Sequence, residues 1–213
     1  MPETHFDDWV AARYETLWPE LFEPAVVEPA VSFLAELAGT GPALEFGVGT
    51  GRIALPLSRR RVRVQGIELS PAMAGRLRAQ PGRSQVEVTV GDFATLTVGG
   101  SFALVYLLRN TITNLTGQDE QVNAFRNAAA HLRPGGCFVI ENYVPELRRL
   151  PPGQTTRVFV ATPTHLGLRS TTSRRRSRCP VTSGRSRAAW RPSPPRTATS
   201  GRQSWISWRE WLE

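Results

Sequence analysis

Apolar residues in the middle of the chain gather in short segments, separated by segments in which they recur every three or four positions. The short apolar-rich segments cover residues 43–46, 62–69, 86–90, 102–108 and 137–140 and predict strands. The wider spacing predicts a helix that opens at 53–57 and helices over 70–79 and 118–132. Two further helices are expected ahead of the first strand, one in the aromatic opening of the chain and one over 25–38. Strands alternating with helices in this way are typical of a parallel sheet.

This alternation divides the chain into three parts. Residues 1–38 are predicted to form an N-terminal helical cap, and residues 39–168 a doubly wound, mostly parallel α/β sheet. Residues 169–213 have no hydrophobic period and are expected to be a disordered Arg/Ser/Pro-rich tail. The last strands of the sheet are therefore predicted to be missing or disordered. His131, late in its helix, is interpreted as a C-terminal capping charge.

Charge changes abruptly at the start of the tail. Residues 1–168 carry 15 arginines and 16 acids, whereas residues 169–213 carry 11 arginines and only 2 acids. There is no lysine, which suggests a GC-rich gene. The tail permits three interpretations: a nucleic-acid-binding arm, a segment without a role, or an out-of-frame translation of the true C-terminus. We favour a frameshift near residue 168, because a neighbouring frame can encode a strand followed by an amphipathic helix. Sequencing the gene across that codon tests it.

The remaining composition favours a soluble cytoplasmic protein. Two cysteines leave no disulfide framework. No apolar run approaches the roughly 20 residues of a membrane span, and the acidic N-terminus does not resemble a secretory signal. No metal site is predicted.

The strongest chemical motif is the glycine-rich segment from Glu45 to Arg52, which lies at a strand-to-helix turn. Glycines at alternate positions let the backbone bend sharply and approach a ligand. The next strand ends at Glu68, where a carboxylate can accept bonds from ribose hydroxyls, and the third ends at Asp92. Because the C-terminal ends of parallel strands meet at one edge, these groups predict a nucleotide site.

Two classes of cofactor are compatible with such a turn. Dinucleotide-binding turns place a small residue at the third glycine position, where this chain has Arg52, and they need a helix N-terminus for the pyrophosphate. A strand end with two carboxylates instead suits a cationic cofactor without phosphate, such as S-adenosylmethionine. An NAD(P)-dependent oxidoreductase remains the alternative within this fold, and nucleic-acid binding through the tail is the alternative outside it.

Four segments together resemble the class I S-adenosylmethionine-dependent methyltransferases of the small-molecule, actinomycete-like type. They are ALEFGVGTGR, GIELSPAM, GDF and LRPGGCFVIE, in the order found in that family. The resemblance implies a Rossmann-like fold with S-adenosyl-L-methionine as cofactor. It places the methionine portion against the glycines, the ribose on Glu68 and the adenine beside Asp92. The cofactor-binding candidates are Glu45, Gly47, Gly49, Gly51, Glu68, Met73, Asp92, Phe93 and Arg109.

The acceptor pocket is predicted at the ends of the fourth and fifth strands. Its candidates are Arg109, Asn110, Glu141, Asn142 and Tyr143, with Tyr14 closing over the cofactor from the N-terminal helix. The expected partner is a small-molecule methyl acceptor. No catalytic base is assigned, because holding donor and acceptor together supplies much of the catalysis of an in-line displacement. The aberrant C-terminus is expected to impair folding or cofactor binding.

Overall fold

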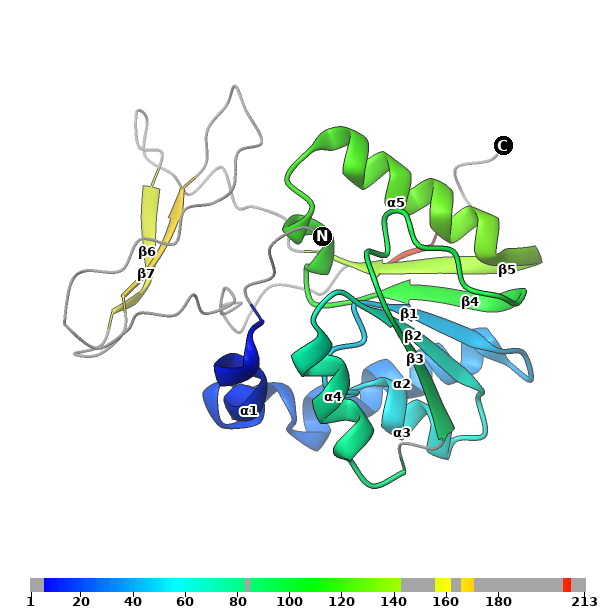
Figure 1. Ribbon diagram of the computed structural model, residues 1–213, viewed down its shortest axis with the longest axis horizontal. Helices are drawn as coiled ribbons and strands as arrows, with labels where there is room; N and C mark the ends of the chain where they lie inside the picture. Colours follow the sequence, from blue (N-terminus) through cyan, green and yellow to red (C-terminus); the bar gives the residue numbers. More distant parts are fainter. Residues whose placement is uncertain (1–5, 83–84, 143–155, 162–165, 171–204, 208–213) are drawn as a thin grey trace.

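A six-stranded sheet forms the centre of the molecule (Figure 1). The computed structural model describes residues 6–82, 85–142, 156–161, 166–170 and 205–207. Strand order is β3-β2-β1-β4-β5-β8, and every pairing from β3 to β5 is parallel. The parallel strands are β1 (Ala43–Phe46), β2 (Val64–Glu68), β3 (Val86–Val90), β4 (Phe102–Leu107) and β5 (Leu132–Glu141). This is the doubly wound Rossmann-like arrangement that the sequence predicts.

Helices cover both faces of the sheet. In Figure 1, α2 (Pro24–Ala38), α3 (Ala54–Arg59) and α4 (Pro71–Ala79) lie on one face and α5 (Gln118–His131) on the other. One apolar cluster joins α2 and α3 to the sheet, and a second joins the opposite face to α5. The N-terminal α1 (Asp8–Leu17) and the short 3-10 helix η1 (Pro19–Leu21) form a third, aromatic cluster. The sheet is thereby fixed from both sides, and its C-terminal edge faces α1.

Local signals in the sequence explain most helix and strand ends. Asp7 caps α1, because its side chain accepts the N–H of Val10, and Pro19 follows soon after its end. Ser70 caps α4 in the predicted manner, accepting the N–H of Met73 at 3.2 Å. Strand β5 differs from the prediction, since it begins at Leu132 and not after the Pro-Gly-Gly turn. A shift in register between the β4 partners of Leu132 and Cys137 accommodates that turn within the strand.

Three strands lie in the C-terminal part of the chain. The tail was expected to contribute nothing to the sheet, but β8 (Trp205–Ser207) pairs antiparallel with the outer edge of β5. The possible strand after residue 155 is present as β6 (Thr156–Ala161). It forms an antiparallel hairpin with β7 (Leu166–Ser170) and lies apart from the main sheet (Figure 1). Most of the predicted tail, 171–204 and 208–213, lies outside the described residues.

His131 does not act as a capping charge. Its side chain is buried, and its Nε2 accepts the backbone N–H of Val98 at 3.0 Å. Its Nδ1 therefore carries the proton and donates to the carbonyl of Asn127 at 2.7 Å. The Asn127 amide in turn donates to the carbonyls of Phe93 and Leu96, both at 2.8 Å. The neutral imidazole and this amide thus fasten the connection after β3 to α5.

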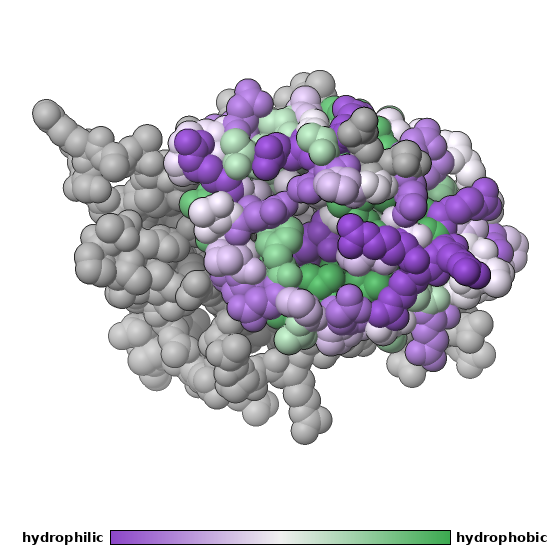
Figure 2. Space-filling view, turned by 90° about the horizontal axis from the view of Figure 1, so that it is seen from below, coloured by the Kyte–Doolittle hydropathy of each residue, from purple (hydrophilic) through white to green (hydrophobic). Residues whose placement is uncertain are grey.

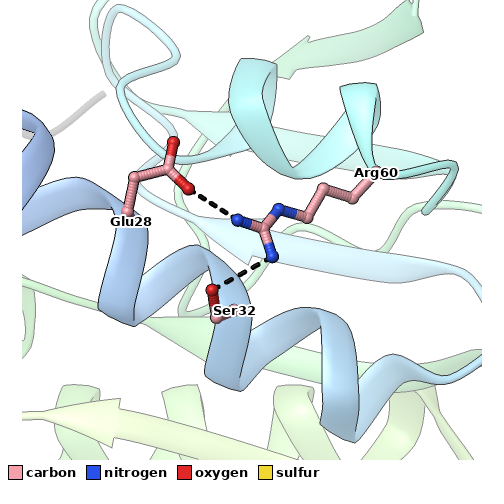
Figure 3. A network of polar contacts seen from close by, with 3 residues as sticks. All are labelled: Glu28, Ser32 and Arg60. Atoms are coloured by element: carbon pink, nitrogen blue, oxygen red, sulfur yellow. Dashed lines mark hydrogen bonds and ion pairs between the residues drawn. The ribbon is translucent and has the colours of Figure 1, made fainter.

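The surface of the helical layer is mostly hydrophilic. Arg60 links two of these helices by an ion pair with Glu28 at 2.5 Å and a hydrogen bond to Ser32 at 3.0 Å (Figure 3). Both ion-paired side chains are more than 40% exposed, so the pair adds little to stability. Figure 2 shows hydrophobic groups in a hollow framed by hydrophilic side chains on the underside. Among the described helices, none combines the length and apolar character needed to cross a membrane.

Candidate functional site

The glycine-rich turn after β1 is held in a conformation that disfavours other residues. Gly47, Gly49 and Gly51 have φ of +69°, +58° and +88°. A Cβ on Gly47 would lie 2.7 Å from the Thr111 methyl carbon, so this position also lacks space for a side chain. The N–H of Gly47 donates to the Ile67 carbonyl at 2.8 Å, which ties the turn to β2. The turn therefore presents its backbone closely to the strand edge, as the sequence predicts.

Glu68, at the end of β2, fixes the same turn from the other side. One carboxylate oxygen accepts the N–H of Gly49 at 2.7 Å, and the other accepts the N–H of Ser70 at 2.9 Å. Burial raises the pKa of this carboxyl, and the two backbone hydrogen bonds oppose that effect. Glu68 thus joins the glycine turn to the start of α4. The sequence predicts a ligand-binding role for it, but not this double backbone contact.

Glu45 lies one strand away and is also buried. It faces Tyr106 across the β1–β4 register, and the Tyr106 hydroxyl donates to Glu45 Oε2 at 2.9 Å. Burial raises the pKa of Glu45 to about 8, although the Tyr106 hydrogen bond and the charge of Arg52 act in the opposite direction. Most Glu45 carboxyls are therefore protonated at neutral pH in the protein without a ligand.

Arg52 connects the glycine turn to the N-terminal cap. Its guanidinium donates to the carbonyl of Leu21 at 3.3 Å. Burial lowers its pKa, and the nearby Glu45 carboxyl and Tyr14 hydroxyl raise it. In the sequence, Arg52 argues only against a dinucleotide cofactor, and it is not among the predicted site residues. Its position directly after Gly51, the third glycine of the turn, is the feature that could have indicated a role in the site.

Tyr14 brings α1 over this edge of the sheet. Burial raises the pKa of its hydroxyl, while the charges of Arg52 and Arg109 lower it. Its ring packs against Phe6, Trp18 and Phe22. The helix is attached to α4, since the Ser70 hydroxyl donates to the Phe6 carbonyl. Tyr14 therefore lies near Arg52, Arg109 and Glu68, and its closure over a cofactor remains a prediction.

The ends of β4 and β5 meet next to Tyr14. Glu141 Oε2 accepts the backbone N–H of Arg109 at 3.0 Å, and the Glu141 carbonyl accepts the N–H of Asn110 at 3.1 Å. Arg109 and Asn110 have φ of +57° and +58°, and they lead into the 3-10 helix η3 (Thr111–Asn114). Asn142 is exposed. The last predicted pocket residue, Tyr143, lies outside the described residues.

The residues predicted for the adenine have mixed positions. Asp92 Oδ1 accepts the N–H of Ala94 at 2.8 Å and so shapes the turn after β3. The ring of Phe93 stacks on Phe46 in the core, with centroids 5.4 Å apart. Met73 is buried, and its terminal methyl would lie 3.6 Å from a Cβ on Gly49. The ring of Phe93 and the side chain of Met73 are thus buried, Asp92 is half-buried at the strand end, and the adenine contact of all three remains a prediction.

Arg52 lies at the centre of a group of charged and polar side chains at this edge of the sheet. The charges of Glu45, Tyr14, Arg109 and Glu141 all act on Arg52, although these five residues come from different elements. One buried carboxyl (Glu45), one half-buried carboxyl (Glu141), two arginines and a phenol therefore gather at one edge of the sheet, beside a backbone turn shaped by glycines. Such a set can bind a ligand that carries both positive and negative groups.

Comparison with known proteins identifies the family. Residues 43–136 match the family described as "Methyltransferase domain". The cypemycin N-terminal methyltransferase of a Streptomyces species is 28% identical over 122 residues, 55% of this chain and 50% of that protein. The chain thus spans half the length of this curated relative.

Solved structures agree with this match. The CcbJ methyltransferase of Streptomyces caelestis is 37% identical, with a TM-score of 0.64 over 80% of this chain and 70% of that one. The S-adenosylmethionine-bound CalS10 of Micromonospora echinaspora, an amino pentose methyltransferase, is 28% identical, with a TM-score of 0.51 over 62% of this chain and 54% of that one. Fold, motif order and these likenesses coincide, and the chain belongs to the class I S-adenosylmethionine-dependent methyltransferases.

Proposed function

We propose that this protein transfers a methyl group from S-adenosylmethionine to an amine nitrogen of a small molecule. The observation that carries the proposal is the glycine turn held by Glu68, because it sets a sharply bent backbone beside a buried carboxylate at two adjacent strand ends. The names of the cypemycin and amino pentose methyltransferases support an amine as acceptor. An oxidoreductase is not favoured, since the matching family and these relatives are methyltransferases.

The residues of the site fit this cofactor chemically. S-adenosylmethionine has an ammonium, a sulfonium, a carboxylate and a ribose, but no phosphate. Glu45 and Glu68 provide carboxyl groups for an ammonium and for ribose hydroxyls, and Arg52 provides a cation for the carboxylate. Asp92 and Met73 are assigned to the adenine side. When bound, the cofactor supplies a methyl group on a positively charged sulfur that a nucleophile can attack in line.

The protein contributes position and exclusion of water. The turn, fastened by Glu68 to both β2 and α4, provides a fixed backbone surface for the cofactor. Tyr14 lies opposite, on a helix whose aromatic cluster shields the strand ends. Glu141 fixes the backbone of Arg109 and Asn110, so the acceptor side is also built on a strand end. This arrangement supports the assignment of Asn110 and Glu141 to the acceptor pocket, and Asn142 and Tyr143, the next residues in the chain, remain candidates from the sequence.

Calorimetry and a transfer assay test the function. We expect the full chain to bind S-adenosylhomocysteine and S-adenosylmethionine, with an affinity that is lower than in an enzyme with an intact C-terminus, and not to bind NADH. It should also form S-adenosylhomocysteine when small amines are added. Binding of NADH in preference to S-adenosylmethionine would contradict the cofactor assignment. Cofactor binding together with transfer only to hydroxyl or carbon acceptors would contradict the amine.

Cofactor binding is expected to release a proton near pH 7. Glu45 is mostly protonated in the free protein, because its pKa is about 8. A bound ammonium favours the ionised carboxylate, so the proton leaves, and the apparent affinity rises with pH until about pH 8. Calorimetry in buffers of different ionisation enthalpy measures this release.

The variant Glu45→Gln provides the control for that measurement. The amide can still accept the Tyr106 hydroxyl bond but has no proton to lose. We expect the proton release to vanish and the affinity to become nearly independent of pH between 6 and 8. Equal release by the wild type and the variant would assign the titration to another group.

A further inference from the structure

Arg109 is a half-buried cation within the site, next to another cation. It lies directly after β4, and its charge acts on both Tyr14 and Arg52. Its effect on Arg52 is repulsive, since it lowers the pKa of that guanidinium. Two arginines that repel each other at one edge of the sheet are stabilised by negative charge nearby.

The neighbouring polar groups are already engaged. Glu141 Oε2 accepts the backbone N–H of Arg109, Glu68 accepts two backbone N–H groups, and Glu45 is bonded to Tyr106. Within the described part of the chain, no hydrogen bond or ion pair of the Arg109 guanidinium is found. Its contact with Glu141 is made by the main chain and leaves its side chain available.

The backbone at this position is unfavourable for arginine. A φ of +57°, followed by +58° at Asn110, lies in the left-handed region where glycine and asparagine are preferred. Glycine would suit the fold better at residue 109. The strain therefore accompanies a side chain that the fold does not require, as is found at ligand-binding positions.

We propose that Arg109 binds an anionic group, a carboxylate, of the methyl acceptor, so that the protein selects acidic amines. This assignment rests on the proposed function. Arg52 belongs to the glycine turn and lies beside Glu45, so it serves the single carboxylate of the cofactor. Arg109 belongs to the end of β4, between Tyr14 and Glu141, where the acceptor is expected. A second anion is therefore left for the acceptor to supply.

Binding to protein saturated with S-adenosylhomocysteine tests the proposal. The probes are two matched pairs, phenylacetate with phenylacetamide and phenylalanine with phenylalaninamide, measured by ligand-observed NMR. We expect each carboxylate to bind at least tenfold more tightly than its amide. Arg109→Gln should remove that preference, and Arg109→Lys should retain part of it. From the sequence, Arg109 is a candidate for the cofactor as well as for the acceptor, so affinity for S-adenosylhomocysteine is measured in both variants. If Arg109 serves the acceptor, that affinity changes less than threefold.

Two controls separate a binding role from a structural one. Arg126→Gln removes an exposed arginine of α5 and should leave both the preference and the cofactor affinity unchanged. Arg109→Gly should lose the preference without lowering the melting temperature, because it relieves the positive φ. Absence of carboxylate preference in the wild type, or its persistence in Arg109→Gln, would overturn the proposal. A tenfold loss of cofactor affinity in Arg109→Gln would assign the residue to the cofactor. Failure to bind S-adenosylhomocysteine at all would instead refute the proposed function.

Discussion

Replacing Glu68 with alanine is expected to weaken cofactor binding by at least a hundredfold. The substitution leaves the N–H groups of Gly49 and Ser70 without their acceptor and removes the carboxylate proposed to bind the ribose. Hydrogen bonds to a charged group contribute about 1.5–3 kcal/mol each, so losing the two proposed bonds to the ribose hydroxyls accounts for a change in affinity of this size. Calorimetry with S-adenosylhomocysteine, on protein shown to be folded by circular dichroism, measures it.

A second ligand separates the two roles of Glu68. 5′-Methylthioadenosine keeps the ribose but lacks the amino-acid end of the cofactor. If Glu68 binds the ribose, Glu68→Gln lowers the affinity for both ligands by the same factor. A loss limited to S-adenosylhomocysteine would mean that Glu68 acts only through the glycine turn. Glu87→Gln, which changes an exposed carboxylate of β3, is the matched control and should alter neither affinity.

The substitution Gly47→Ala is expected to destabilise the protein by roughly 2–5 kcal/mol and to abolish cofactor binding. The left-handed φ of +69° costs a residue with a Cβ about 1–2 kcal/mol. In addition, the new methyl group would lie 2.7 Å from the Thr111 methyl carbon, an overlap that typically costs about 1–3 kcal/mol. Urea denaturation of the variant and the wild type gives the difference in the free energy of unfolding.

A double-mutant cycle divides that loss into its two parts. Thr111→Ser removes the overlapping methyl group but keeps the hydroxyl that donates to the Leu108 carbonyl at 2.7 Å. In the double variant Gly47→Ala with Thr111→Ser, the free energy lost to the overlap should be recovered, whereas the free energy lost to the left-handed backbone should remain. Gly75→Ala is the control within α4, where nothing lies within 4 Å of an added Cβ, and it should be neutral or stabilising. A cycle without coupling would show that Thr111 moves freely aside.

The parts of the molecule that follow from local patterns could be predicted from the sequence. The five parallel strands follow from the spacing of apolar residues, and the glycine turn follows from the missing Cβ atoms. The Ser70 cap depends only on a backbone N–H three residues later. The proximity of Glu45, Glu68 and Asp92 could also be predicted, because the C-terminal ends of parallel strands lie at the same edge of the sheet. The proposed role of Tyr14 comes from the resemblance to similar enzymes, whose N-terminal helices close over the cofactor, and the structure shows the Tyr14 hydroxyl near Arg52 and Arg109.

Contacts between distant segments could not be predicted in this way. His131 has the sequence position of a capping residue, but the loop that reaches it from β3 decides that its ring is neutral and buried. Phe93 follows Asp92, a predicted ligand-binding residue, but the ring of Phe93 is buried in the core, where it stacks on Phe46. The sequence shows only that Arg52 is too large for the third glycine position of a dinucleotide-binding turn. In the structure its guanidinium donates a hydrogen bond to the Leu21 carbonyl. Each outcome depends on a partner far away in the chain.

The pairing of β8 with β5 has a consequence for the order in which the protein folds. Strand β5 carries Glu141, which fixes the backbone of Arg109, and its outer edge pairs with residues much later in the chain. Contacts between such distant segments form slowly, because a long loop must close first. During synthesis, the outer edge of β5 therefore remains unpaired until β8 has been made, and it can associate with other strands in that interval. The end of β5 and the Arg109 backbone that it fixes, where we propose that the acceptor binds, thus form late and are most exposed to misassembly.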